Sequence, residues 1–350
     1  MTNRSAFKYP GAALPMLYAL GHLLMDGLCA ATVFGPLAQV PDRTTLLLVY
    51  NTLAFSTQCL VGLAADRVRR HRLSAALALG LTLLGFLLPA PPMVRIVLIA
   101  GGNSLFHVAG GAHTLEQSRG KAGPLGVFVA PGAVGLVLGT MWPGLGPVFA
   151  AATGLCAVGL LLVSEPPRQS PASAGQLDTG VLIPVLLLTA AVAVRAIGGS
   201  VVSFPWKTGR LWSLVTVLCV FAGKTAGGFV CDGLGPKKAA WISLPPAAVL
   251  IAFCGSWALP SLLGQLALNL TMPITLYLLY RLMPEAPGFA FGLAAAALWP
   301  GTIAGGLIRL TGPWQWVFTL VCFLFGLWAV LLACRAETRR SPASMGKERL

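Results

Sequence analysis

The chain has 350 residues, of which 56% are hydrophobic and only 10% are charged. An ordinary soluble domain carries roughly a quarter of charged residues, so this composition excludes a soluble fold and indicates helices that cross a lipid bilayer. The net charge of +14 comes from short basic clusters between apolar runs, which argues against nucleic-acid binding. The eight cysteines lie in or beside apolar runs without metal-binding spacing. We therefore expect no disulfide framework, no metal site and no cofactor.

A membrane-crossing helix needs about 20 apolar residues. By this criterion the predicted spans of the first half are 12–35, 45–64, 73–90, 94–113, 122–142 and 145–163. Those of the second half are 180–202, 211–231, 239–257, 261–280, 287–308 and 314–334. The prediction is an all-α integral membrane protein with twelve transmembrane helices in two pseudo-symmetric halves. Residues 1–164 form an N-terminal six-helix bundle, 165–179 a cytoplasmic linker, and 180–350 a C-terminal six-helix bundle with a basic cytoplasmic tail.

The basic residues indicate how the chain is oriented. If the N-terminus is cytoplasmic, 17 Lys and Arg residues fall on the cytoplasmic side and five on the opposite side. This bias follows the positive-inside rule and predicts that both termini are cytoplasmic. We expect a compact monomer in the plasma membrane, which for a bacterial protein is the inner membrane.

The two halves repeat each other in the same direction. Gly62 and Asp66 in the first half correspond to Gly228 and Asp232 in the second. Asn103 corresponds to Asn269, and Pro131-Gly132 corresponds to Pro300-Gly301. The first two pairs have the same separation along the chain, and the separation of the third is slightly longer. Parallel repeats of this kind place a substrate site between the halves, at the bilayer midplane.

The loop after the second span resembles the signature of the major facilitator superfamily, in which a Gly and an Asp precede a basic run. The residues that carry the resemblance are Gly62, Asp66, Arg67, Arg70 and Arg72, and in the second copy Gly228, Asp232, Gly235, Lys237 and Lys238. Arg69 departs from the pattern because that family usually has Gly there. The resemblance implies a loop that latches the cytoplasmic ends of neighbouring helices. A plain positive-inside anchor is the alternative.

The fifth span contains Gly126, Pro131, Gly132, Gly135 and Gly139. This pattern is similar to the Gly/Pro motif of the antiporters of that superfamily, and close helix packing explains it equally well. The stretch from Asn103 to His107 resembles the fourth span of fosmidomycin-resistance-type exporters.

Asp26 is the one acidic residue well inside a predicted span. A charge at the bilayer centre costs about 2.5–3.5 kcal/mol, so it should face the bundle interior with a partner. His22 lies one helical turn away on the same face. We expect Asp26 to be the proton-coupling site and His22 to modulate it, because a carboxylate and an imidazole can exchange a proton at physiological pH. A structural hydrogen bond that carries no proton is the alternative.

The predicted substrate-binding residues are Arg195, His107, Asn103, Lys224 and Asn269. By the repeat offset Arg195 lies opposite Asp26–Cys29, so the hypothesis is a switchable Arg195–Asp26 pair across the central cavity. Its alternative is a static ion pair. Lys224 lies in the eighth span, where it could line the cavity or extend toward the membrane surface.

Together these features favour a secondary transporter, specifically a proton-coupled exporter of a small anionic or zwitterionic solute. The alternative is a proton-coupled importer or a facilitator of a small anionic metabolite. A membrane enzyme is disfavoured because the loop residues Glu116, Asp178 and Glu285 do not cluster. A structural or sensory subunit would not need charged residues buried at matching positions of two repeats. The expected partners are the solute, protons and the lipid bilayer.

Overall fold

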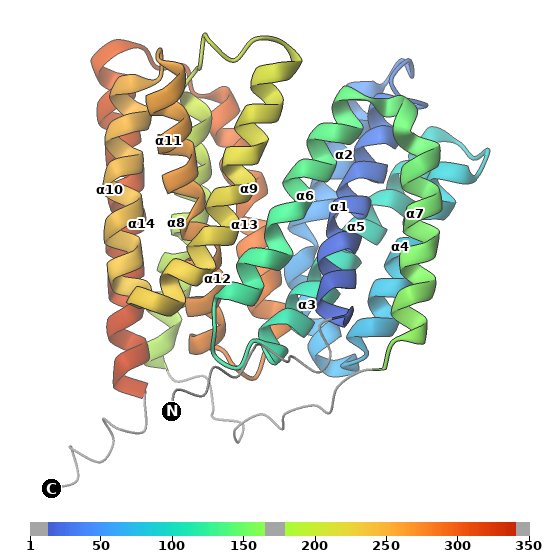
Figure 1. Ribbon diagram of the computed structural model, residues 1–350, viewed down its shortest axis with the longest axis horizontal. Coiled ribbons are helices and arrows are strands. Elements are labelled where there is room, and N and C mark those ends of the chain that lie inside the picture. The colour runs from blue at the N-terminus through green and yellow to red at the C-terminus, as the bar shows by residue number, and fades with distance from the viewer. Residues whose placement is uncertain (1–12, 165–178, 341–350) are drawn as a thin grey trace, which may run out of the picture.

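The computed structural model describes residues 13–164 and 179–340, and within these two stretches the regular elements are all helical. The predicted linker lies almost wholly outside the described residues, as do Arg4, Lys8 and the tail beyond Arg340. The chain forms two helical bundles that stand side by side (Figure 1). Residues 13–164 build one bundle and residues 179–340 build the other.

The N-terminal half contains seven α-helices and two short irregular helices. These are α1 (Ala13–Phe34), α2 (Arg43–Asn51), the π-helix η1 (Thr52–Ser56), α3 (Gln58–Val68), α4 (His71–Leu87), α5 (Pro92–Gln117), α6 (Gly123–Met141), the 3₁₀-helix η2 (Pro143–Leu145) and α7 (Gly146–Leu162).

The C-terminal half contains seven α-helices. These are α8 (Thr179–Val201), α9 (Gly209–Leu234), α10 (Pro236–Cys254), α11 (Ala258–Asn269), α12 (Thr271–Leu282), α13 (Pro287–Leu307) and α14 (Gly312–Arg340).

The described residues contain ten helical segments that are long and apolar enough to cross a membrane. A further candidate is the pair α2–η1 and α3, which is bent by 41°. The shorter apolar helix α4 occupies the position of the third predicted span. These twelve segments follow the predicted order, and they confirm an all-α membrane fold of two six-segment halves.

Two predicted spans are interrupted. The second contains the π-helical turn Thr52–Ser56, and the tenth is divided at Leu270 into α11 and α12. Pro273 explains the break in the tenth span, because proline has no backbone N–H and its ring collides with the carbonyl four residues earlier. Pro245 and Pro246 lie inside α10 without ending it.

Glycines on α6 and α13 allow these helices to pack closely within their own halves. A Cβ at Gly135 or Gly139 would overlap the α1 backbone at Leu23 or Gly27. In the second half, Gly301 and Gly305 of α13 approach α8 in the same way. Small residues at such spacing let backbones approach, so the glycine motif of the fifth span is a packing surface in this structure.

The two halves meet at the end of the molecule where α3 and α9 finish and α6 and α13 begin (Figure 1). Here α3 packs against α13, and α6 packs against α9. A Cβ at Gly62 would collide with the backbone of Gly288, and one at Gly228 with that of Ala122. Gly62, in the motif of the first repeat, therefore contacts the second half of the chain. Gly228, in the motif of the second repeat, contacts the first half.

Candidate functional site

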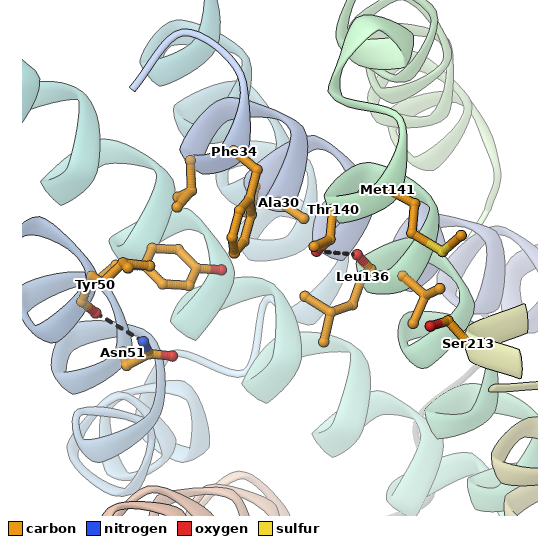
Figure 2. A pocket seen from close by; sticks show the side chains of 12 residues that line it. Ala30, Phe34, Tyr50, Asn51, Leu136, Thr140, Met141 and Ser213 are labelled. Carbon is orange, nitrogen blue, oxygen red and sulfur yellow. Dashed lines mark hydrogen bonds between the residues drawn. The ribbon is translucent and has the colours of Figure 1, made fainter. Parts of the chain in front are cut away.

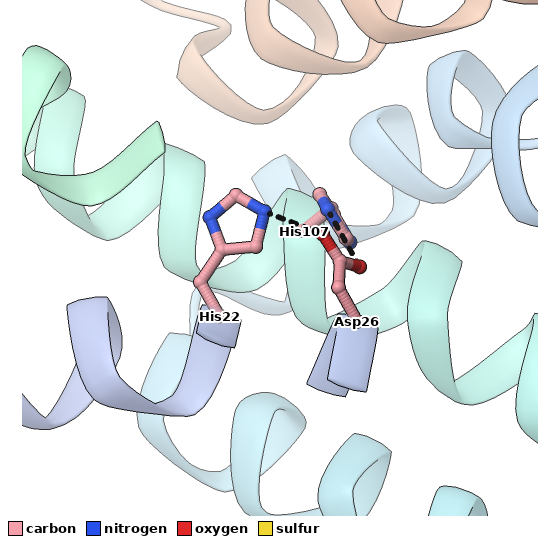
Figure 3. Close-up of side chains that lie close together, drawn as sticks. All are labelled: His22, Asp26 and His107. Carbon is pink, nitrogen blue, oxygen red and sulfur yellow. Dashed lines mark ion pairs between the residues drawn. The ribbon is translucent and has the colours of Figure 1, made fainter. Parts of the chain in front are cut away.

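A cluster of two histidines and one aspartate lies in the middle of the N-terminal half (Figure 3). Asp26 and His22 come from α1, and His107 comes from α5. His22 Nε2 lies 3.4 Å from Asp26 Oδ2, and His107 Nε2 lies 3.7 Å from Asp26 Oδ1. The imidazole rings pack edge to face with their centroids 4.4 Å apart. We call these three residues the histidine–aspartate cluster.

Backbone carbonyl groups fix the orientation of both imidazole rings. His22 Nδ1 lies 2.8 Å from the carbonyl oxygen of Phe128 on α6, and His107 Nδ1 lies 2.9 Å from that of Asn103. A carbonyl can only accept a hydrogen bond, so each Nδ1 carries the donated proton. In a neutral ring the Nε2 atom is then unprotonated, and in both rings it is this atom that faces the carboxylate.

Asn103 completes the surroundings of Asp26. Its side-chain nitrogen donates a hydrogen bond of 3.0 Å to Asp26 Oδ1 and orients the carboxylate. On the other side the backbone of α6 comes close at Gly132, where a Cβ would overlap both His22 Nε2 and Asp26 Oδ2. Gly132 of the fifth-span motif therefore lets the α6 backbone lie directly against the cluster.

A cavity of about 430 Å³ lies at the C-terminal ends of α1 and α6 (Figure 2). It is lined mainly by apolar side chains of α1, α2 and α6, with Tyr50, Asn51, Thr140 and Ser213 as its polar groups. Cys29, one turn above Asp26 on α1, belongs to this lining. The side chains of Asp26 and His107 are 18% and 12% exposed, so the cluster is buried but not sealed.

Two further predicted residues, Lys224 and Arg195, occupy different environments. Lys224 on α9 is close enough to Asp26 and His107 to interact with both electrostatically. Arg195 points into its own half, where Nη1 donates hydrogen bonds to Thr271 and Thr275 of α12. Its aliphatic stem packs against Gly326 of α14. Within the described residues there is no ion pair between Arg195 and Asp26, so their exchange of partners stays a prediction.

Asn269 lies at the end of α11, apart from the cluster. Its side-chain nitrogen donates a 2.8 Å hydrogen bond to the carbonyl of Gln265, and its Cβ packs against Gly223 of α9. The substrate-binding role predicted for Asn269 has no direct geometric support in this conformation.

The two motif aspartates make matching contacts between the halves. Asp66 at the end of α3 accepts hydrogen bonds of 2.7 and 2.8 Å from the backbone N–H groups of Gly288 and Phe289 at the start of α13. Asp232 at the end of α9 accepts bonds of 2.6 and 2.9 Å from Ala122 and Gly123 at the start of α6. Carboxylates are favourable at helix N-termini, where N–H groups lack partners. We call these two contacts the latch.

The basic residues predicted for the same motif surround the latch. Arg67 lies in the last turn of α3 and Arg70 immediately precedes α4. Lys237 is in the first turn of α10, beside Arg335 of α14. All three lie at the end of the molecule where the halves touch.

The histidine–aspartate cluster is also the group of described residues that could hold a metal ion. His22, Asp26 and His107 each offer one ligand atom, and these atoms lie within 4.8 Å of one another. The sequence predicts no metal site, because neither the cysteines nor the histidines have metal-binding spacing, whereas the three residues here come from two helices that are far apart in the chain.

Comparison with known proteins gives similarity of structure without similarity of sequence. No protein-family model matches the chain, and neither does any curated protein sequence. Among solved structures, the E. coli fucose:proton symporter FucP, in a variant form, superposes with a TM-score of 0.64 over 93% of this chain and 97% of its own, at 13% identity. The chain has the major facilitator fold.

Two further structures with this fold agree. FucP in its outward conformation has a TM-score of 0.65 and 14% identity, and covers 91% of this chain and 98% of its own. A bacterial homologue of the iron transporter ferroportin, in an outward-facing state, has a TM-score of 0.57 and 15% identity, and covers 93% and 98%. FucP is a transporter, and the third structure is a homologue of one. The narrower likeness to fosmidomycin-resistance-type exporters finds no support in them.

Some features of the site were not visible in the sequence. The carbonyl group of Phe128 orients His22, and no sequence pattern marks a backbone acceptor. The cavity lining at Tyr50, Asn51, Thr140 and Ser213 comes from three helices whose rotation the apolar runs do not define. Gly132 was part of a recognised motif, but its position beside the cluster required the structure.

Proposed function

We propose that this protein is a secondary transporter that works by alternating access and exports a small anionic or zwitterionic solute in exchange for protons. The observation that carries the proposal is the pairing of a latch at one end of the two halves with a cavity toward the other end, whose lining begins one turn from Asp26. Such a protein exposes a central site to one side at a time. The known transport activities of proteins with this fold support the same conclusion.

The proposed orientation places the latch in the cytoplasm, with both chain termini on that side of the inner membrane. Eleven of the basic residues with described side chains gather at the latch end: Arg67, Arg69, Arg70, Arg72, Arg119, Lys121, Lys237, Lys238, Arg281, Arg335 and Arg339. The positive-inside rule assigns this end to the cytoplasm. The cavity then faces outward, as in the two outward-facing neighbours.

Proton coupling is proposed for Asp26, with His22 and His107 as its neighbours. Two Nε2 atoms and a carboxylate face one another, and a proton placed on any of them turns a repulsive contact into an attractive one. In the middle of the described membrane segments, two cationic side chains, Lys224 and Arg195, outnumber the one carboxylate. This excess of positive charge favours an anionic group on the solute. Proton-coupled import, or facilitated diffusion of a small anionic metabolite, is the second candidate, and the symport activity of FucP favours it.

The test is transport in sealed vesicles under an imposed pH gradient, with a panel of anionic metabolites and phosphonate antibiotics as solutes. We expect the wild type to accumulate one of them in response to the gradient. Asp26→Asn should retain solute exchange but lose gradient-driven accumulation. Glu116→Gln is a matched control, because Glu116 also faces a histidine, His71, at 3.2 Å, but outside the cluster.

Gradient-independent flux that is unchanged in Asp26→Asn would overturn proton coupling and leave a facilitator. Uptake and efflux by intact cells distinguish export from import. Absence of flux for every solute in the panel, with correctly folded protein, would count against an anionic substrate.

A further inference from the structure

The facing atoms of the histidine–aspartate cluster have no hydrogen between them when both rings are neutral. Each Nδ1 donates its proton to a carbonyl, so His22 Nε2 and His107 Nε2 present lone pairs toward the oxygens of Asp26. Lone pairs that face one another in this way repel, and a cation placed between them turns the repulsion into attraction. We propose that the cluster binds a divalent first-row transition-metal ion through His22 Nε2, His107 Nε2 and one oxygen of Asp26. This inference does not depend on whether the protein transports anything.

The distances fit shared ligation better than direct hydrogen bonding. A hydrogen bond between N and O spans about 2.7–3.2 Å, and the two contacts of 3.4 and 3.7 Å are longer. Ligand atoms that each lie about 2.1 Å from one ion are about 3–4 Å from each other. The three candidate atoms lie within 4.8 Å of one another, so small rotations of the side chains suffice to complete the site.

The groups behind the ligands match those of metal sites. A histidine ligand normally donates its second ring N–H to a carbonyl or carboxylate, which fixes the tautomer. His22 does so to Phe128, and His107 does so to Asn103. Asn103 also donates to Asp26 Oδ1, which leaves Oδ2 free for the ion. All three proposed ligands are therefore held with the required lone pair directed inward.

The site also has a cavity nearby and the ligand types of a transition-metal site. Gly132 lets the α6 backbone pack against two of the ligand atoms, with which a Cβ would collide. The cavity lined by Cys29 and Ala30 begins one turn above Asp26 and gives the ion and its remaining water ligands an approach. Two imidazoles and one carboxylate with open positions suit ions such as Zn²⁺, Fe²⁺ and Co²⁺, and do not suit Ca²⁺ or Mg²⁺, which prefer oxygen ligands.

One neighbouring charge opposes the ion. Lys224 of α9 interacts electrostatically with Asp26 and His107, and its ammonium group would be repelled by a divalent cation. Its flexible stem allows it to move away at some cost. Removal of this charge should therefore tighten metal binding. If Lys224 only bound an anionic solute, its removal would not be expected to tighten metal binding.

The experiment uses the full-length protein in detergent, with its purification tag removed, equilibrated at fixed pH with Co²⁺ or Zn²⁺ alone. Binding is measured by metal content after gel filtration and by the visible absorption of bound Co²⁺. We expect one ion per chain in the wild type. His22→Gln, Asp26→Asn and His107→Gln should each weaken binding at least tenfold, and Asn103→Ala should weaken it about 10- to 100-fold. Lys224→Met should strengthen it.

His71→Gln is the matched control, because His71 also faces a carboxylate but has no second histidine beside it. It should bind metal as the wild type does. Thermal unfolding of each variant shows whether it is folded, and the strengthened binding of Lys224→Met cannot result from misfolding. The proposal is overturned if the wild type binds no more metal than a His22→Gln/Asp26→Asn/His107→Gln triple variant, or if His71→Gln weakens binding as much as the cluster variants do. A negative result here leaves the vesicle experiment on proton coupling unaffected.

Discussion

Arg69 occupies a backbone conformation that favours glycine. It ends α3 with φ of 51°, in the left-handed region, and Gly235 ends α9 at the equivalent place in the second repeat with φ of 80°. For a residue with a side chain this conformation costs about 1–2 kcal/mol. Because Arg69 stands where the motif has glycine, the end of α3 is strained. The Arg69 side chain offsets part of the cost by donating a 3.2 Å hydrogen bond to the carbonyl of Asp66.

Arg69→Gly should therefore stabilise the protein by about 0.5–1 kcal/mol, since glycine adopts this conformation without strain. The measurement is the thermal midpoint of the detergent-solubilised protein. Gly235→Arg is the reciprocal change and should lower the midpoint. A lower midpoint for Arg69→Gly would show that the side-chain contacts of Arg69 outweigh the strain.

The residues of the cluster show what the sequence can and cannot predict. His22 and Asp26 were found because residues four apart share a helix face, and this holds for any helix. The prediction for Arg195 depended instead on the alignment of the repeats. In the first half, Gly135 contacts Leu23 and Gly139 contacts Gly27. In the second half, Gly301 contacts Ala193 and Gly305 contacts Ile197. These matching contacts align Leu23 with Ala193 and Gly27 with Ile197.

By this alignment Arg195 corresponds to Met25, which is fully buried inside its own half. Because neighbouring residues on an α-helix are about 100° apart, a shift of one position changes the direction in which a side chain points, and the role of Arg195 stays a prediction. An offset taken from motifs in other spans and loops could not reveal this difference.

At the scale of helices, the latch joins the ends of α3 and α9 to the beginnings of α6 and α13. Each aspartate satisfies two backbone N–H groups that otherwise lack partners at a helix start. The order of the spans and the two motif copies were predictable from apolar runs and spacing. Which helix each aspartate would cap was not, because that depends on packing between halves far apart in the chain.

Asp66→Asn and Asp232→Asn should each weaken the latched state by about 1–3 kcal/mol, because a charged acceptor of two hydrogen bonds becomes neutral. The measurement is the distance distribution between spin labels at Lys121 and Lys238, which lie in different halves near the latch. We expect a longer-distance population in each single variant and a larger one in the double variant.

Glu337→Gln is the control, since Glu337 pairs with Arg281 at 2.7 Å within one half at the same end. It should leave the distance distribution unchanged. A distribution that is also unchanged in the double variant would contradict a latching role for the two aspartates.

At the scale of the whole molecule, the positive-inside bias and the position of the cavity together predict which side of the membrane is open. Ser213→Cys in the cavity should react with a membrane-impermeant maleimide in intact cells, above the background of native cysteines. Gly233→Cys, exposed near the latch, should react only after permeabilisation. The reverse pattern would place the latch outside the cell and invert the proposed topology.

The reciprocity of the latch has a consequence for the origin of the chain. The first repeat supplies a carboxylate to a helix start of the second, and the second repeat returns the same contact to the first. This is the pattern of a two-fold symmetric dimer, in which one surface patch pairs with its own copy. The seam inside this chain is therefore one that two identical half-length chains could have formed before they were joined. Halves produced today as separate polypeptides should still carry the information needed to recognise each other.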